Sequence, residues 1–244
     1  MSKKEKVAVV ALDAQSLPRA QALALRLNTA VSCDPDTVSG MVLEVSQDRL
    51  ALRDTTQPRT RALTIDAAKR RYAPAGKDLL ARALGRQCQS IIDATAGFGS
   101  DTFDFVRRGK TVVAIERVEV AAIMLEAAAS ARCPDHETGT LQVVRGDAIE
   151  KISSLKTVDV IFLDPMFPDR DRHTAKPRKA QQFLRRLAGE DADGATLLQV
   201  ARLHARGRVI VKRPRHAQPL GGKPDIVHQG KAVRYDVYLT RGAA

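Results

Sequence analysis

The sequence predicts an α/β fold, a mainly parallel seven-stranded sheet with helices on both faces, preceded by a small α+β segment. From about residue 73 onward, apolar runs typical of strands alternate with runs at helical spacing, and such alternation implies parallel strands joined by crossovers. Polar or glycine-rich residues follow the apolar runs, at the strand ends where parallel sheets bind ligands. We expect residues 1–72 to form a small N-terminal domain with a basic linker, and residues 73–244 to form the main domain.

The N-terminal segment contains apolar runs that predict two kinds of element. We expect a strand at 7–12, a helix at 17–27 and a hairpin of strands 41–45 and 49–52 around Ser46-Gln47-Asp48. Residues 53–71 are polar and basic, which predicts a linker or a surface that faces nucleic acid. No catalytic cluster is recognisable in this segment.

The main domain is predicted from its alternating apolar runs, of which 120–131 is rich in alanine. We expect helices at 78–84, 101–108, 120–131, 180–187 and 195–205, and strands at 90–93, 111–116, 141–145, 158–163, 208–212, 225–228 and 233–239. The last two strands are close enough in sequence to form an antiparallel pair.

The chain is strongly basic, with 40 Lys and Arg against 28 Asp and Glu, a net charge of +12 and a pI of about 10.0. This excess favours a polyanionic partner, although a generally basic solvated surface would also produce it. Basic residues cluster at 169–186 and at 202–215. The candidate RNA-binding residues are Arg170, Arg172, Lys176, Arg178, Lys179, Lys212 and Arg213. Aromatic residues are 4% and Trp is absent, which argues against an extended base-stacking platform.

Composition also bears on location and metals. Hydrophobic residues make up 44%, enough for a sizeable core, and no apolar run approaches the length of a membrane span. We expect a soluble cytoplasmic protein with no membrane association. Three dispersed cysteines and five histidines show no metal-ligand spacing, so no metal is expected.

The stretch Asp93-Ala94-Thr95-Ala96-Gly97-Phe98-Gly99-Ser100-Asp101 predicts a strand, a glycine turn and a helix. An ordinary tight turn is one interpretation. A dinucleotide fingerprint is another, but its third glycine would fall at Thr102. A loop for S-adenosylmethionine, of the form Asp-x-Gly-x-Gly-x-Gly, fits at Asp93, Gly97 and Gly99, with Thr95 in place of its first glycine.

Acidic residues close the next two strands. Glu116 could accept both ribose hydroxyls of an adenosine cofactor, or it could simply cap a buried strand. Its neighbour Arg117 could line the adenosine pocket or point to water. Asp147 could lie near the adenine with Ala148 packed on the ring, or it could be an ordinary turn aspartate after glycine.

The string Asp164-Pro165-Met166-Phe167-Pro168 ends a fourth apolar strand. It places a carboxylate, a restrained backbone carbonyl and an aromatic ring together, which suits a flat substrate with an amino group. We expect Asp164 and the Pro165 carbonyl to accept N–H bonds and Phe167 to stack on the base. A loop punctuated by two prolines is the alternative. Four successive strand ends of this kind together favour methyl transfer to an amino group.

These residues, with Val209-Ile210-Val211-Lys212-Arg213-Pro214, resemble the ribosomal RNA small subunit methyltransferase J family. The resemblance covers residues from about 73 to 240. It implies a class I methyltransferase fold, S-adenosyl-L-methionine as cofactor, and methyl transfer to the exocyclic N2 of a guanosine in 16S ribosomal RNA. It also implies cofactor contacts from Ser100, Asp101, Glu116, Arg117, Asp147, Ala148 and Asp164. The expected partner is 16S ribosomal RNA or the small ribosomal subunit.

The residues themselves are also consistent with two other functions. One is amino-group methylation of another RNA or DNA base. The other is a non-catalytic RNA-binding factor in ribosome assembly, which the presence of Asp164 and Phe167 disfavours. A nicotinamide dehydrogenase is disfavoured by Thr102.

Overall fold

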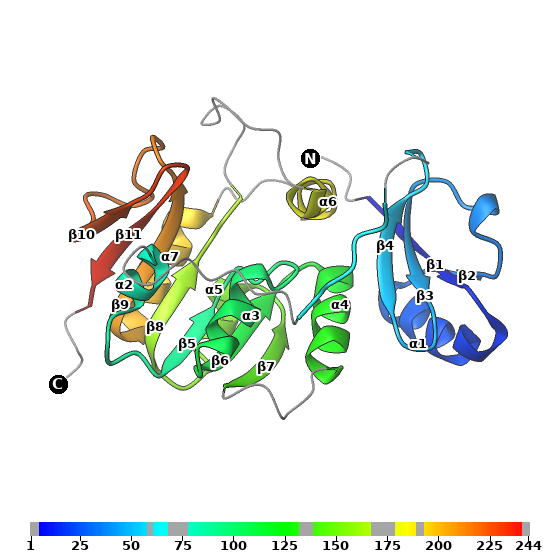
Figure 1. Cartoon of the computed structure of the whole chain (residues 1–244), viewed down its shortest axis with the longest axis horizontal. Coiled ribbons are helices and arrows are strands. Elements are labelled where there is room, and N and C mark those ends of the chain that lie inside the picture. The colour runs from blue at the N-terminus through cyan, green and yellow to red at the C-terminus, as the bar shows by residue number, and fades with distance from the viewer. Residues whose placement is uncertain are drawn as a thin grey trace.

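The described residues form two β-sheets, which are built from consecutive parts of the chain (Figure 1). The computed structural model describes residues 5–57, 61–67, 78–131, 139–166, 179–188 and 193–240. Within these ranges, no helix is long and apolar enough to cross a lipid bilayer.

The larger sheet contains seven strands among the described residues. They are β5 (Ser90–Asp93), β6 (Thr111–Glu116), β7 (Thr140–Arg145), β8 (Val158–Leu163), β9 (Ala205–Pro214), β10 (Ile226–Gln229) and β11 (Val233–Leu239). Their order is β10-β11-β9-β8-β5-β6-β7, and β11 runs antiparallel to both of its neighbours while the other pairs are parallel. The chain winds outward from β5 through β6 to β7 and then returns to β8, so β5 and β8 flank the topological switch point.

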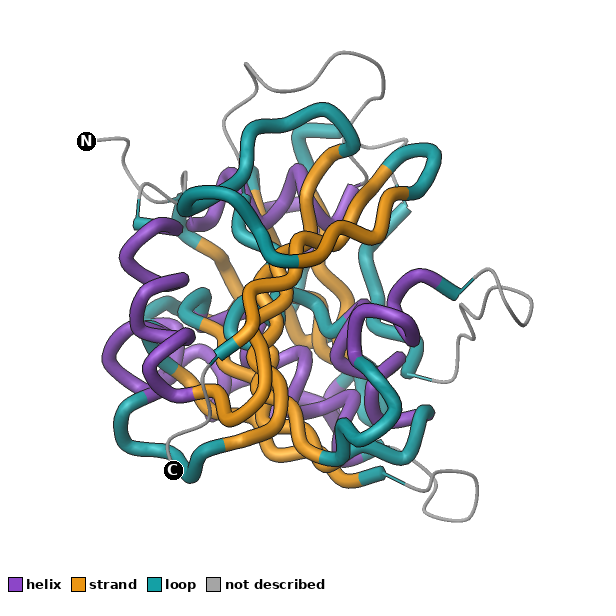
Figure 2. The backbone as a smooth tube through the Cα atoms, turned by 90° about the vertical axis from the view of Figure 1, so that its left-hand side faces the viewer, coloured by secondary structure: helices purple, strands orange, loops and turns teal. Residues whose placement is uncertain are grey.

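Helices cover both faces of this sheet (Figure 2). The helices on one face are α2 (Leu79–Leu84), α3 (Ser100–Arg107) and α4 (Glu119–Ser130), and those on the other are α5 (Ala148–Ile152) and α7 (Gly194–His204). Strand residues alternate between the two layers: Ile91 packs with α2 and α3, whereas Ile92 packs with α5 and α7. This two-sided burial explains the continuous apolar runs within the central strands, such as residues 160–163 of β8.

The smaller sheet comes from residues 7–54. Its described strands are β1 (Val7–Ala11), β2 (Val31–Ser32), β3 (Met41–Val45) and β4 (Leu50–Asp54), in the order β2-β1-β3-β4. β1 is parallel to β2 and β3, and β3 is antiparallel to β4. The helix α1 (Leu17–Leu27) joins β1 to β2 and ends at Asn28, whose φ of 50° is left-handed. We call β1–β4 with α1 the N-terminal unit.

Two helices lie between the sheets, α4 and the ten-residue α6 (Lys179–Ala188) (Figure 1). One hydrophobic cluster joins the strands of the N-terminal unit to these helices, with Ile123 and Met124 contributed by α4 and Phe183 and Leu187 by α6. The two sheets therefore share a buried core and are not joined by a linker alone.

The predicted fold class is confirmed, and the strands at 90–93, 111–116, 158–163 and 233–239 begin and end where they were expected. The structure adds β2, α5 and two short 3₁₀ helices, η1 (Ala14–Ser16) and η2 (Pro35–Thr37), which the sequence did not predict. These elements have two to five residues, too few to show a hydrophobic period.

Candidate functional site

The carboxyl ends of β5, β6, β7 and β8 border a cavity of about 600 Å³, part of which is open to solvent. It lies at the switch point of the sheet, where the loops after β5 and β8 diverge. The lining residues are Ala94, Thr95, Gly97, Ile115, Glu116, Arg117, Val118, Gly146, Asp147, Ala148, Ile149, Asp164, Pro165, Met166, Leu184, Ala188, Asp193 and Leu197.

The loop between β5 and α3 places its backbone at the cavity. Gly97 and Gly99 both have positive φ, 54° and 78°, which L side chains adopt with strain. A Cβ atom at Gly99 would lie 2.5 Å from the Leu125 side chain and 2.7 Å from the Phe103 ring, so a larger residue would force these buried side chains to shift. At Gly97, which lines the cavity, a Cβ atom would lie 2.8 Å from Leu184 of α6. The two glycines let the chain turn tightly and approach a ligand closely.

Asp93 lies beneath this loop and does not line the cavity. Its side chain is buried, and it accepts a hydrogen bond of 2.6 Å from the Thr102 hydroxyl and a longer one of 3.4 Å from the Thr95 N–H. Burial raises the pKa of Asp93 to about 7, although the bond from Thr102 opposes the shift. Asp93 therefore connects the start of the loop to the first turn of α3.

Glu116, at the end of β6, is buried and faces the same loop. Its two carboxylate oxygens accept hydrogen bonds of 2.6 Å from the N–H groups of Gly97 and Val118. Each carboxylate oxygen can accept more than one bond, so this oriented group also suits a ribose diol. Next to Glu116, the guanidinium of Arg117 lies 3.8 Å from the carboxylate of Asp193, and both residues line the cavity.

The end of β7 supplies a polar cap and an apolar wall. Asp147 caps α5, because its carboxylate accepts a 2.8 Å hydrogen bond from the Ile149 N–H. Ala148, Ile149 and Leu197 line the cavity beside it. An adenosine needs acceptors for its ribose and apolar contact for its ring, and the groups at the ends of β6 and β7 provide both.

Asp164 is held from two sides at the end of β8. Its N–H donates to the Thr95 hydroxyl at 2.6 Å, and its carboxylate accepts from the Lys212 ammonium at 2.8 Å. Lys212 also donates to Asp101 at 2.6 Å. Burial disfavours the charge of Lys212, but the carboxylates of Asp164 and Asp101 outweigh it and raise the pKa of Lys212. The three side chains form a charged cluster beside the cavity.

The predicted cofactor residues divide into two groups. Gly97, Glu116, Arg117, Asp147, Ala148 and Asp164 line the cavity, whereas Asp93, Gly99, Ser100 and Asp101 lie outside its lining. Pro165, which was predicted as a catalytic residue, also lines the cavity. Ser100 is exposed in the first turn of α3. The lining residues Leu184, Ala188 and Asp193 were not predicted, because they come from segments without a recognisable motif. In the sequence, Thr95 is notable only because it replaces the first glycine of the cofactor loop. In the structure, its hydroxyl accepts a hydrogen bond from the Asp164 N–H.

The predicted RNA contacts are only partly described. Phe167, Arg170, Arg172, Lys176 and Arg178 lie outside the described residues. The other three basic residues make contacts within the protein, and their contact with RNA stays a prediction. Arg213 is buried and donates to the Gln218 carbonyl, Lys212 binds Asp101 and Asp164, and the buried Lys179 ammonium lies 5.2 Å from the centre of the Phe183 ring.

Among the described residues, no three His, Cys, Asp or Glu side chains are grouped so that they could hold a metal ion.

Comparison with protein families identifies one model, described as "Putative SAM-dependent methyltransferase", which matches residues 25–240. The match begins within α1 and therefore includes most of the N-terminal unit as well as the larger sheet.

Curated relatives carry the name Ribosomal RNA small subunit methyltransferase J. One from Chromohalobacter salexigens is 35% identical over 238 residues, which cover 90% of this chain and 93% of the relative. Another from Coxiella burnetii is 35% identical over 240 residues, which cover 92% and 93%. A crystal structure of a SAM-dependent methyltransferase from Neisseria gonorrhoeae is similar with a TM-score of 0.73 and 28% identity, and 97% of each chain is covered.

Proposed function

The chain belongs to the S-adenosylmethionine-dependent ribosomal RNA small subunit methyltransferase J family, and from this membership we propose that it methylates the exocyclic N2 of a guanosine in 16S ribosomal RNA. The relatives' name supports the ribosomal RNA substrate. The choice of an amino group rests on the residues at the end of β8.

The observation that carries the proposal is the position of Asp164 and Pro165. Both line the cavity at the end of the strand next to the glycine loop. Asp164 is half-buried and its backbone is held by Thr95, so its carboxylate is presented in a defined place. A held carboxylate next to a restrained carbonyl suits a flat amine, which has two N–H bonds to donate.

The mechanism follows from what such an amine lacks. Its lone pair is delocalised into the ring, so it is a poor nucleophile. S-adenosylmethionine supplies an electrophilic methyl group on a sulfonium. We infer that Asp164 and the Pro165 carbonyl accept the two N–H bonds and turn the lone pair toward that methyl. Positioning of this kind can lower a barrier by several kcal/mol, up to roughly 7–11 in model systems. Asp164 or solvent then takes the proton.

Lys212 enters this proposal as a positioning residue. Its ammonium contacts one oxygen of Asp164 and one of Asp101, and these are two like charges that would otherwise repel each other. We infer that Lys212 orients the Asp164 carboxylate toward the amine. The RNA contact that the sequence predicted for Lys212 stays a prediction beside this role.

The experiment uses labelled S-adenosylmethionine with small ribosomal subunits that lack this modification, followed by mass spectrometry of the nucleosides. We expect N2-methylguanosine at one site. Asp164→Ala should lose turnover and keep most of its cofactor affinity, because glycine-loop and Glu116 contacts remain. Near-normal turnover of that variant would refute the role of Asp164.

Free 16S ribosomal RNA, large subunits and duplex DNA serve as comparison substrates. Methylated adenine, or transfer to DNA alone, would overturn the proposed substrate and favour another amino-group methyltransferase. RNA binding with no transfer to any substrate would favour a non-catalytic assembly factor. The proposal places the reaction in the cytoplasm, where ribosomal subunits are assembled.

A further inference from the structure

Helix α6 forms a wall between the cavity and the N-terminal unit. Two of its side chains, Leu184 and Ala188, line the cavity, while Phe183 and Leu187 are buried in the cluster shared with the N-terminal unit. Leu184 also lies against the glycine loop, because a Cβ atom added to Gly97 would be 2.8 Å from its Cδ1 atom. The placement of α6 therefore shapes the pocket that we propose for the cofactor.

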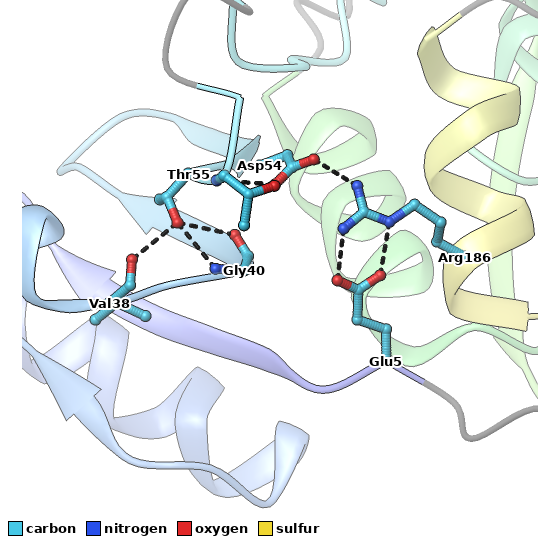
Figure 3. Close-up of polar contacts among 7 residues, drawn as sticks. Glu5, Val38, Gly40, Asp54, Thr55 and Arg186 are labelled. Carbon is cyan, nitrogen blue, oxygen red and sulfur yellow. Dashed lines mark hydrogen bonds and ion pairs between the residues drawn. The ribbon is translucent and has the colours of Figure 1, made fainter.

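One arginine of α6 is bound by the N-terminal unit on two sides (Figure 3). The Arg186 guanidinium donates to both oxygens of Glu5, at 2.8 and 2.6 Å, and to Asp54 at 2.5 Å. A guanidinium bound through three of its N–H groups has a defined orientation, because its fork is planar and rigid. Arg186 lies between Leu184 and Ala188 in the sequence, so the same contacts orient the two cavity residues.

One acceptor of Arg186, Asp54, is also held by residues of its own strand end. Asp54 ends β4 and is fully buried, and its second oxygen accepts from the N–H and the hydroxyl of Thr56 at 3.0 and 2.6 Å. Burial alone would raise the pKa of Asp54, but Thr56 and Arg186 outweigh it and lower that pKa. The Thr55 hydroxyl donates to the Val38 carbonyl at 2.8 Å and accepts from the Gly40 N–H at 2.9 Å, which fixes this strand end (Figure 3).

Sheet register brings the two acidic residues to the same edge. Val7 pairs with Met41, and Met41 pairs with Asp54, so the start of β1 and the end of β4 lie in one row across the sheet. Glu5 precedes the first residue of β1 by two positions. Both carboxylates therefore face α6 from one edge of the smaller sheet.

We propose that the N-terminal unit acts as a positioning scaffold for the cofactor pocket, by holding α6 against the glycine loop through the contacts of Arg186 with Glu5 and Asp54. Arg186 does not line the cavity, so it acts on the cofactor only through the position of Leu184 and Ala188. The inference rests on the proposed function, since it takes this cavity as the binding site of S-adenosylmethionine.

A second ion-pair group joins the same two parts of the molecule and provides a matched control. Arg26 of α1 contacts Glu119 and Glu126 of α4, at 3.1 and 2.8 Å. It supports docking of the N-terminal unit without touching α6. Loss of Arg26 should therefore weaken the docking of the N-terminal unit on α4 without displacing α6 from the cavity.

The experiment measures the affinity of the full chain for S-adenosylmethionine by calorimetry and the hydrogen exchange of α6 amides. If Arg186→Gln leaves α6 in place in a tenth of the molecules, the apparent Kd rises about tenfold. Faster exchange across residues 181–188 should accompany this rise. Glu5→Gln, which keeps Asp54 paired with Arg186, should shift both quantities in the same direction by less, and Arg26→Gln should leave both near the wild-type values.

Two results would overturn the inference while leaving the proposed function intact. One is an unchanged Kd in both Arg186→Gln and Glu5→Gln. Another is an equal loss of affinity in Arg26→Gln, which would indicate general destabilisation. If Arg186→Gln does not fold because Asp54 is left unpaired, Glu5→Gln decides the question. Failure of the wild-type chain to bind S-adenosylmethionine would instead refute the proposed function, and the inference with it.

Discussion

Replacing Asp93 with asparagine should change how the stability of the protein depends on pH. Asp93 is buried beneath the glycine loop, and its pKa is raised to about 7. Asparagine cannot ionise but keeps an oxygen that accepts the 2.6 Å bond from Thr102. The variant therefore mimics the protonated form of Asp93 at every pH.

The magnitude follows from the difference between the folded and unfolded pKa values. An aspartate in an unfolded chain has a pKa near 4, so between about pH 4 and 7 the folded state binds a proton that the unfolded state has lost. This contribution to stability is complete below pH 4 and is lost as the pH rises through 7. Three pKa units correspond to about 4 kcal/mol, at 1.36 kcal/mol per unit.

The assay is urea unfolding followed by circular dichroism at several pH values from 5 to 8, with wild type, Asp93→Asn and Asp48→Asn compared. Asp48 is an exposed carboxylate in the β3–β4 turn and serves as the control. The advantage of Asp93→Asn over wild type should grow by roughly 2–3 kcal/mol between pH 5 and 7 and stay constant above that. The control should follow the wild type.

A constant difference between Asp93→Asn and wild type at pH 5 and pH 8 would refute the reasoning. It would mean that Asp93 has the same charge in both states across this range. A difference that shrinks as the pH rises would contradict the sign of the shift.

Three further predictions concern the site and its partner. Lys212→Met leaves Asp101 and Asp164 without their shared cation, so turnover on small subunits should fall at least about tenfold. Lys212→Arg should keep more activity because it keeps the charge, and equal activity of Lys212→Met and wild type would refute the positioning role. Gly97→Ala combines a left-handed φ with a close approach to Leu184, so calorimetry should show about tenfold weaker cofactor binding, partly recovered in the double variant with Leu184→Ala. Charge reversal of Lys176 and Arg178 should weaken RNA binding. The slope of log K against log salt concentration should fall by roughly 0.7 for each phosphate that these side chains neutralise, and an unchanged slope would assign both to a solvated surface.

The elements of the larger sheet could be predicted because their signals are local. Apolar runs of four to seven residues predicted β5, β6, β8 and β11 to the residue. Arg206 and Gly207 concealed the start of β9, which begins at Ala205 and not at the predicted residue 208. In α5, five residues gave too little periodicity to be recognised.

The candidate site was predictable where its residues follow strands directly. Gly97, Glu116, Asp147 and Asp164 come at the ends of four parallel strands, so recognising the strands was enough to place them at one edge. The sequence predicted RNA contact for Lys212 because this residue lies in a basic run. No local pattern indicates which side chains lie beside it in the fold. Pairing of β8 with β9, which brings Leu163 opposite Val211, puts Lys212 beside Asp164.

By itself, the sequence determined the fold class, the glycine turn and the acidic residues that close the strands, because hydrophobic period and turn chemistry act over a few residues. Tertiary structure decided which of these residues share the cavity, that Lys212 pairs with Asp164, and that Arg186 docks on Glu5 and Asp54. Glu5 and Arg186 are 181 positions apart. Contacts at such separations depend on strand order, register and helix packing, which no local pattern specifies.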